Sequence, residues 1–355
     1  MALKIPDRYK PTGTTLKGGM GEVWICVDQH LDRKVAIKAV ADVSDVPRLL
    51  DEIAALQEIR SKHVVEIYDV VYGTKKSEIA VVEDFIPGED LFALPPLTKS
   101  IDYLRVIYQI ACGISDIHAH KRIHRDIKPN NMKFDQEHLI KIFDFGLSRL
   151  FGTTASTAGF KGTLGFAAPE LFGVGKVTFT EAVDTYAFGA TAWGLATHDF
   201  PADLVKAPPR LPVAGMDFAK LPVKLPASVS DLLNRCLSIT PADRPEMSIV
   251  RDTISKHLLH GTHRALVVSG GRTYDFHGSG KSVEFGIAGL GKLTITYDGL
   301  DFTATNVEGE VFVNNMAITV GHQFVGSCVI ALGGPARGNQ RAYVTFDVSH
   351  PEVLL

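Results

Sequence analysis

The sequence predicts an α+β protein that has two lobes followed by a small all-β domain. Three observations predict this class: alternating strand patterns in the first 90 residues, amphipathic helical patterns up to residue 258, and glycine with β-branched residues from Arg264 onward. We expect these boundaries: an N-terminal lobe at 1–90, a C-terminal lobe at 91–258, a linker at 259–265 and an all-β domain at 266–355.

The bulk composition is that of a folded protein with more than one core. The chain has 355 residues, which is too many for one typical core, and 45% of them are hydrophobic while 22% are charged. The net charge of −3 argues against a nucleic-acid-binding protein that works by general attraction to phosphates. We therefore expect no nucleic-acid partner.

The cysteines and the apolar runs bear on the compartment. The four cysteines form no CxxC pair, which argues against a zinc site or a disulfide framework: Cys26, Cys112, Cys236 and Cys328. Residues 1–11 have no apolar core like that of a signal peptide, and no apolar run is long enough to span a bilayer. We therefore expect a cytoplasmic protein with reduced thiols and no membrane span.

Glycines gather near the N-terminus in the stretch Leu16-Lys17-Gly18-Gly19-Met20-Gly21-Glu22-Val23. Glycine lets the backbone approach phosphates closely, and free N–H groups of such a loop can bind phosphate oxygens. A simple hairpin explains this stretch about as well.

A lysine and a glutamate follow this loop. Residues 34–40 alternate like a strand that carries Lys38, and residues 47–60 read as a helix whose apolar face lies next to Glu52. By itself Lys38 could be a strand lysine with its head in solvent. Two other acidic residues compete with Glu52 as the partner of Lys38: Asp51 and Glu58.

The next segments lead to a compact set of polar residues. Strands are expected at 64–72 and 79–85, and a long helix at 100–120. The stretch His124-Arg125-Asp126-Ile127-Lys128-Pro129-Asn130-Asn131 follows, and Asp144-Phe145-Gly146 comes shortly after.

These polar residues suit one kind of chemistry. Asp126 can orient a hydroxyl and accept its proton, and Lys128 can neutralise charge on a moving phosphoryl group. Asn131 and Asp144 offer oxygen ligands of the kind that Mg2+ prefers. Phosphoryl transfer requires mostly positioned oxygens, metal and cations. Either short motif alone is a weak signal, because each is also an ordinary loop sequence.

Together the two motifs resemble the catalytic loop and the metal-binding loop of eukaryotic-type Ser/Thr protein kinases, and the resemblance covers about residues 9–258. It implies a two-lobed protein kinase fold and an ATP-dependent Ser/Thr kinase that uses ATP and Mg2+. The catalytic residues it implies are Asp126, Lys128, Asn131, Asp144, Lys38 and Glu52, with Asn131 and Asp144 on the metal. The nucleotide-binding residues it implies are Leu16, Lys17, Gly18, Gly19, Met20, Gly21, Val23, Ala36 and Lys38.

Two positions depart from the family pattern. Leu16 stands where the family has the first glycine of its loop. Glu83 falls at the gatekeeper position at the back of the pocket, where family members usually have an apolar residue. Either the alignment is off by one residue or the back of the pocket is polar, and both interpretations stay open.

The resemblance also assigns residues after Asp144. Hydroxyl residues in the loop 147–165 are candidate autophosphorylation sites, although such residues are common in loops: Thr153, Thr154, Ser156 and Thr157. Thr163 is expected to bond Asp126 and Lys128, which favours Ser/Thr substrates. Glu170 is expected to pair with Arg244, and Asp184 to anchor the catalytic-loop backbone.

The C-terminal segment reads as an all-β domain, with strands expected at 265–268, 283–285, 292–296, 301–305, 311–313, 328–332 and 342–348. Its later half, 293–315, faintly resembles a forkhead-associated (FHA) domain, a reader of phosphothreonine. The Gly-Arg pair of that family is not evident, because Gly286 is followed by Ile287, and the serine and histidine signature is missing. A structural or partner-docking module is therefore the favoured interpretation.

Two other protein classes share part of this pattern. A pseudokinase scaffold, which binds partners without catalysis, gains support from Leu16 and Glu83, but the lysine and both aspartates are present. A small-molecule phosphotransferase typically has His-Gly-Asp and lacks Ala-Pro-Glu, whereas this chain has His124-Arg125-Asp126 and Ala168-Pro169-Glu170. The loop Gly18–Val23 resembles that of bacterial kinases.

The sequence does not identify the protein substrate.

Overall fold

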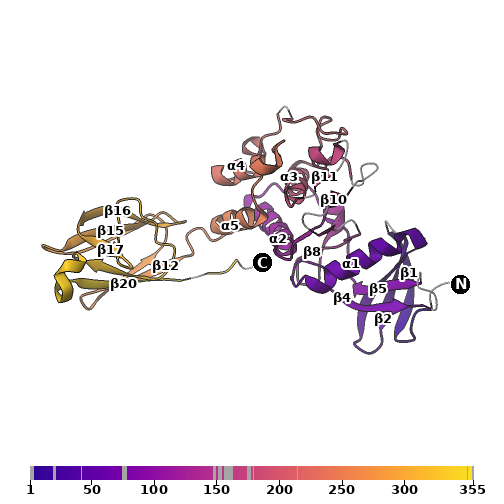
Figure 1. The fold of residues 1–355 in the computed structure, drawn as a ribbon, viewed down its shortest axis with the longest axis horizontal. Helices are drawn as coiled ribbons and strands as arrows, with labels where there is room; N and C mark the ends of the chain where they lie inside the picture. The colour runs from indigo at the N-terminus through magenta and orange to yellow at the C-terminus, as the bar shows by residue number, and fades with distance from the viewer. Residues whose placement is uncertain are drawn as a thin grey trace. The chain divides into compact units, whose positions relative to one another are not determined.

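The chain forms two compact units, one ending at Ile254 and the other beginning at Ser255 (Figure 1). The structure is a computed structural model, and it describes residues 4–18, 21–40, 42–73, 78–146, 149–150, 154–155, 163–173, 177–178, 180–213, 215–349 and 351–353. The predicted α+β class is confirmed, with a strand-rich lobe, a helical lobe and a separate all-β region.

The strand-rich lobe is built on a five-stranded antiparallel sheet in the order β1-β2-β3-β5-β4. The strands are β1 (Tyr9–Gly18), β2 (Gly21–Asp28), β3 (Arg33–Val40), β4 (Ile67–Tyr72) and β5 (Ile79–Asp84). Helix α1 (Val46–Glu58) covers one face, where Leu49 and Ile53 pack with Ile79 and Val81. Because side chains alternate along a strand, Lys38 and Ala36 share one face of β3, opposite the face of Val35 and Ile37.

The second lobe is helical. Its helices are α2 (Ser100–Ala119), α3 (Ala182–Thr197), α4 (Ala227–Cys236) and α5 (Met247–Leu258), the last of which continues into the second unit. Helix α3 is buried almost throughout, which matches its mainly apolar sequence. Gly113 in α2 allows a close approach, because a Cβ there would lie 2.7 Å from Ile142 Cδ1.

Short strands and 3-10 turns lie between the longer elements of the first unit. The strands are β6 (Arg122–Ile123), β7 (Met132–Phe134), β8 (Ile140–Ile142), β9 (Arg149–Leu150), β10 (Thr154–Ala155) and β11 (Val177–Thr178). The 3-10 turns are η1 (Val43–Asp45), η2 (Leu91–Ala93), η3 (Pro129–Asn131), η4 (Pro169–Phe172), η5 (Phe218–Lys220) and η6 (Pro241–Asp243). Pairing of β7 with β8 brings Met132 opposite Ile142, so residues just before β7 lie near those just after β8.

The second unit contains two antiparallel sheets. The larger has the order β13-β12-β20-β19-β17-β18 and the smaller β14-β15-β16. Their strands are β12 (Arg264–Ser269), β13 (Arg272–His277), β14 (Lys281–Ile287), β15 (Gly291–Tyr297), β16 (Phe302–Gly309), β17 (Val311–Val313), β18 (Met316–Ala317), β19 (Cys328–Leu332) and β20 (Ala342–Val348), with a 3-10 segment η7 (Pro335–Gln340).

Aromatic side chains join these two sheets. Phe302 of the smaller sheet lies 5.7 Å from Phe276 and 5.6 Å from Phe346 of the larger one, measured between ring centroids. Such edge-to-face contacts add to the burial of apolar area. No sequence pattern predicted β13, an edge strand whose side chains are mostly exposed.

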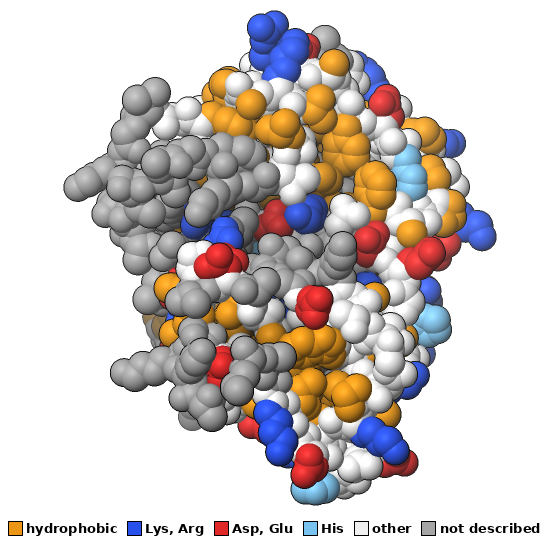
Figure 2. Space-filling model, turned by 90° about the vertical axis from the view of Figure 1, so that its right-hand side faces the viewer, with side chains coloured by type: hydrophobic (Ala, Val, Ile, Leu, Met, Phe, Trp, Pro, Cys, Tyr) orange, Lys and Arg blue, Asp and Glu red, His pale blue; other side chains and the backbone are white. Residues whose placement is uncertain are grey.

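Three further properties are plain in the described part of the chain. No helix there has both the length and the apolar character needed to cross a bilayer. On the face drawn in Figure 2, charged side chains of both signs lie among hydrophobic ones. All four cysteines are free thiols.

Candidate active site

A cavity of about 190 Å³ lies in the first unit, with walls from both lobes. Its lining combines strand residues with the segment after β5 and residues beside β7 and β8: Leu16, Val23, Ile25, Ala36, Lys38, Val65, Glu83, Asp84, Phe85, Ile86, Lys133, Phe143 and Asp144. Most of these side chains are apolar and five are charged, as in a site for a flat organic ring bearing a charged group.

Lys38 is the cation of the cavity lining that pairs with Glu52 and Asp144. Its Nζ lies 2.8 Å from Glu52 Oε1 on α1 and 3.1 Å from Asp144 Oδ1. Burial opposes the charged form of Lys38, but Glu52 and then Asp144 outweigh it and hold the pKa of the ammonium above its usual range. Lys38 is therefore a fixed positive charge that joins a strand, a helix and the loop after β8.

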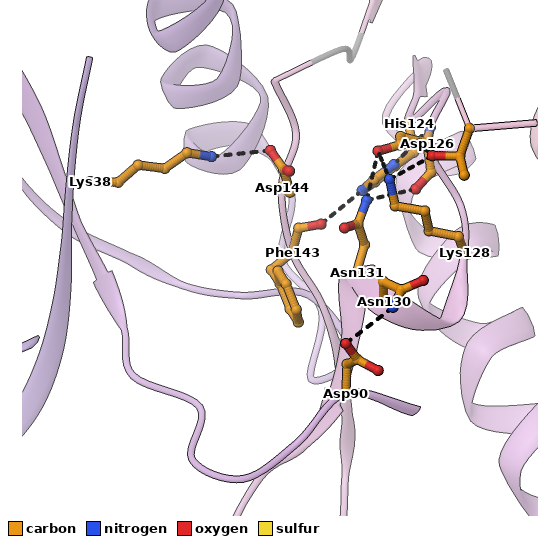
Figure 3. A network of polar contacts seen from close by, with 10 residues as sticks. Lys38, Asp90, His124, Asp126, Lys128, Asn130, Asn131, Phe143 and Asp144 are labelled. Carbon is orange, nitrogen blue, oxygen red and sulfur yellow. Dashed lines mark hydrogen bonds and ion pairs between the residues drawn. The ribbon is translucent and has the colours of Figure 1, made fainter. Parts of the chain in front are cut away.

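Asp144 presents its carboxylate from a strained turn. Its φ of 67° lies in the left-handed region, which is uncommon for a residue other than glycine. Burial works against ionisation of this carboxyl, yet Lys38 holds its pKa below the ordinary value. Asp144 is thus an anion beside the cavity, and Figure 3 shows Lys38 directed at it.

A second polar cluster surrounds Asp126. Lys128 Nζ donates to Asp126 Oδ2 at 2.7 Å and to Thr163 Oγ1 at 2.8 Å, while Thr163 Oγ1 donates to Asp126 Oδ1 at 3.3 Å. Asn131 Nδ2 donates to the backbone oxygen and to Oδ2 of Asp126, both at 2.9 Å. Lys128, Asn131 and Thr163 together hold the Asp126 carboxylate, and Figure 3 shows the first two beside it.

Asp184 on α3 anchors the backbone of the loop that carries Asp126. Its carboxylate accepts hydrogen bonds from the backbone N–H groups of His124 and Arg125, each at 2.8 Å. His118 Nε2 lies 3.1 Å from the same carboxylate. Burial opposes the charge of Asp184, but the hydrogen bond from His118 leads the effects that hold its pKa below normal. Arg125 itself has a φ of 70°, which the anchor helps to maintain.

Glu170 and Arg244 form a two-pronged ion pair. Arg244 Nη1 lies 2.6 Å from Glu170 Oε1, and Nη2 lies 2.8 Å from Oε2. The Arg244 side chain is fully buried and also donates to the backbone oxygen of Ala182, where α3 begins. The pair therefore ties the segment after residue 163 to the helical lobe.

Glu83 faces the cavity from β5. It is 9% exposed and lies opposite Ala36 on β3, so its side chain is on the cavity face of the sheet. Of the two interpretations left open above, the structure favours the polar back wall. Burial raises the pKa of Glu83 to about 8, and the charges of Glu52 and Asp144 add to the rise while Lys38 opposes it.

Some predicted positions lie outside the described residues: Gly19, Met20, Thr153, Ser156 and Thr157. For others the structure describes the backbone alone: Lys17 and Gly18 at the end of β1, Gly21 at the start of β2, and Thr154 in β10. Leu16, Val23 and Ala36 line the cavity.

Sequence reasoning missed several residues of the site. Ile25, Val65, Lys133 and Phe143 line the cavity but carry no distinctive pattern. Position was the only signal, and it applies to three of them: Ile25 comes two residues after Val23, Lys133 two residues after Asn131, and Phe143 directly before Asp144. His118 lies near the end of α2 and carries no distinctive pattern, because its contact with Asp184 depends on packing between α2 and α3.

The residues present suit a Mg2+ ion. Asn131 donates both N–H bonds to Asp126, so its amide oxygen is the atom left for a cation. Asp144 supplies a carboxylate held in its ionised form. Magnesium is usually coordinated by one or two protein oxygens together with substrate phosphates and water, and Asn131 and Asp144 supply such oxygens. No denser cluster of three metal-binding side chains occurs among residues that the structure describes.

Residues 13–255 match the family model described as protein kinase domain. The chain is 27% identical over 250 residues to the Sucrose non-fermenting protein kinase 1 of Fusarium virguliforme, covering 68% of this chain and 35% of that protein. It is 29% identical over 243 residues to the Carbon catabolite-derepressing protein kinase of Candida glabrata, covering 66% and 39%. It is 34% identical over 200 residues to Mitogen-activated protein kinase 8 of Arabidopsis thaliana, covering 52% and 33%. The chain thus spans about a third to two fifths of these relatives' length.

Proposed function

This chain belongs to the protein kinase domain family, and we propose that it is an ATP-dependent protein-serine/threonine kinase. The observation that carries the proposal is the pair of polar clusters, Lys38 with Glu52 and Asp144, and Asp126 with Lys128 and Thr163. A scaffold without catalysis would have no need for both clusters to be complete. The names of the relatives support the same class of reaction.

ATP would bind with its base in the apolar part of the cavity and its phosphates toward Lys38. Mg2+ held by Asp144 and Asn131 would neutralise charge on the phosphates. Lys38, positioned by Glu52, would hold the α- and β-phosphates. Backbone N–H groups of the glycine stretch 18–21 would bind the phosphate oxygens.

The protein's own residues then direct the transfer. Asp126 would accept a hydrogen bond from the substrate hydroxyl, orient it toward the γ-phosphorus and take its proton. Lys128 lies within reach of Asp126 and would offset charge on the transferred group. Thr163 bridges the two, so the substrate site is assembled only when the segment carrying Thr163 lies against the catalytic loop.

The test is transfer of γ-phosphate from ATP and Mg2+ to a generic protein substrate by the full chain. Asp126→Asn and Lys38→Met are expected to abolish transfer, whereas the exposed Glu66→Gln control leaves it unchanged. Transfer that persists in Asp126→Asn would contradict the assignment. Nucleotide binding without transfer by the unaltered chain would favour the pseudokinase scaffold.

Activation-loop autophosphorylation is part of the proposal. The candidate acceptors are Thr153, Thr154, Ser156 and Thr157, and Arg125 in the catalytic loop is the residue that family members use to bind such a phosphate. Mapping of phosphosites after incubation with ATP tests this. Phosphate found only outside residues 147–165 would contradict it.

For the second unit we propose a docking module for a protein partner, with an FHA-like fold but without phosphothreonine reading. A surface hollow is lined by Glu284, Glu308 and Glu310, and its cations are already paired: Lys292 lies 3.0 Å from Glu284, and Arg337 lies 2.8 Å from Glu310. An anionic ligand would meet net negative charge there. Titration of the full chain with phosphorylated and unphosphorylated 147–165 peptides is expected to show no preference for phosphate. We further propose that this is a kinase of the bacterial type, and its glycine-rich stretch 18–23 supports this proposal.

A further inference from the structure

Glu83 is a buried acidic side chain of the cavity lining that the proposed reaction does not use. Its Oε2 atom is buried and has no hydrogen-bond partner in the described structure. A buried polar atom without a partner costs stability, on the order of 1–3 kcal/mol. Such a group is retained at a binding site when a ligand supplies the missing partner.

The charges around Glu83 determine which form it takes. Lys38 on β3 is the cation that acts most strongly on it, while Glu52 on α1, Asp144 after β8 and Asp84 on its own strand are all acidic. Lys133 of β7 is a second cation of the same cavity lining. Lys38 is already engaged by Glu52 and Asp144. A further buried carboxylate has no countercharge left, so Glu83 holds a proton at neutral pH.

A protonated carboxyl offers one donor and one acceptor side by side. The edge of adenine that carries N7 and the N6 amine shows the complementary acceptor and donor, whereas guanine shows two acceptors, N7 and O6. Glu83 lines the same cavity as the segment Asp84–Ile86, so a base in that cavity lies against both.

Resting on the proposed ATP site, we propose that Glu83 is a specificity-determining residue whose neutral carboxyl donates to adenine N7 and accepts from the N6 amine. The residue therefore selects adenine over guanine from the back of the pocket. A merely structural role would leave the choice of base unaffected.

The test is calorimetric titration of the full chain with ADP and GDP in EDTA, so that no metal ion is involved. Glu83→Gln keeps a donor and an acceptor, Glu83→Met keeps the volume without either, and exposed Glu66→Gln is the matched control. Glu83→Met is expected to weaken ADP binding about tenfold and to lose most of the preference over GDP. Glu83→Gln and the control are expected to retain both.

The dependence on pH provides a second readout. Wild-type affinity for ADP is expected to fall between about pH 6.5 and about pH 9.5 as Glu83 ionises, whereas Glu83→Gln stays level. This comparison decides the matter if Glu83→Met fails to fold. Unchanged ADP affinity and base preference in Glu83→Met, or the same pH profile in wild type and Glu83→Gln, would overturn the inference but leave the proposed kinase intact. Absence of any ADP binding by the wild type would overturn both.

Discussion

Lys38 Nζ and Glu52 Oε1 lie 2.8 Å apart in the interior of the strand-rich lobe, where the Glu52 side chain is fully buried. A buried pair of this kind depends on both partners, because removing one leaves an uncompensated charge. The position of the Lys38 ammonium therefore depends on the position of α1, because α1 carries Glu52.

Replacement of Glu52 by glutamine should therefore lower the rate of transfer more than the stability of the fold. Glutamine keeps the packing but leaves Lys38 held by Asp144 alone, and we expect a loss of about 100-fold in kcat/KM. Steady-state kinetics check this, with Asp51→Asn on the same helix as control. A Glu52→Gln rate equal to that of the control would contradict the role of Glu52.

Thr163 offers a test of the link between Asp126 and Lys128. Thr163→Val keeps the shape but removes the hydroxyl that contacts both residues, and we expect transfer to fall by about tenfold or more. Thr163→Ser should restore most of the activity, because it returns the hydroxyl. Equal activity of the valine and serine variants would show that the hydroxyl has no part in transfer.

The Glu170–Arg244 pair should matter for stability. Glu170→Ala leaves the buried Arg244 guanidinium without its carboxylate, at a cost of about 3–5 kcal/mol in the free energy of unfolding. Asp203→Ala breaks the solvent-exposed pair with Lys206 and should leave the melting temperature nearly unchanged. Denaturant titrations of the two variants make the comparison, and equal losses would be inconsistent with it.

Glu83 makes the stability of the protein dependent on pH. Its pKa is raised from 4.5 to about 8 in the folded state, so between these values the folded chain holds a proton that the unfolded chain releases. The stabilising contribution is complete below about pH 4.5 and is lost as the pH rises through about 8. Relative to wild type, Glu83→Gln should gain melting temperature steadily from pH 5 to pH 8. A constant difference across this range would argue against a buried proton.

The sequence predicted the site residues whose roles follow from local spacing in the chain. Lys38, Asp126 and Asn131 lie in short patterns whose roles follow from neighbours in the chain. The contact of His118 with Asp184, by contrast, joins residues 66 positions apart and forms only when α2 packs on α3. Glu83 stayed undecided because a one-residue shift in a strand turns a side chain to the other face, and only the pairing with Ala36 resolves it.

The fold was predicted best where hydrophobic periodicity was strong. The pattern in residues 100–120 predicted α2 almost to its ends, whereas β13 was missed because an exposed edge strand needs few apolar residues. Such a strand is defined by its hydrogen bonds to β12, which no local pattern encodes.

The pairing of the first and last strands of the second unit has a mechanical consequence. Ala265 at the start of β12 lies opposite Val348 at the end of β20, and the strands run antiparallel. A force that draws these two chain ends apart therefore acts on one hydrogen-bonded pair at a time, as in opening a zipper, and not on the whole ladder at once. Under tension the unit should open from this end at low force, and its response to load is set by the residues where the chain enters and leaves it.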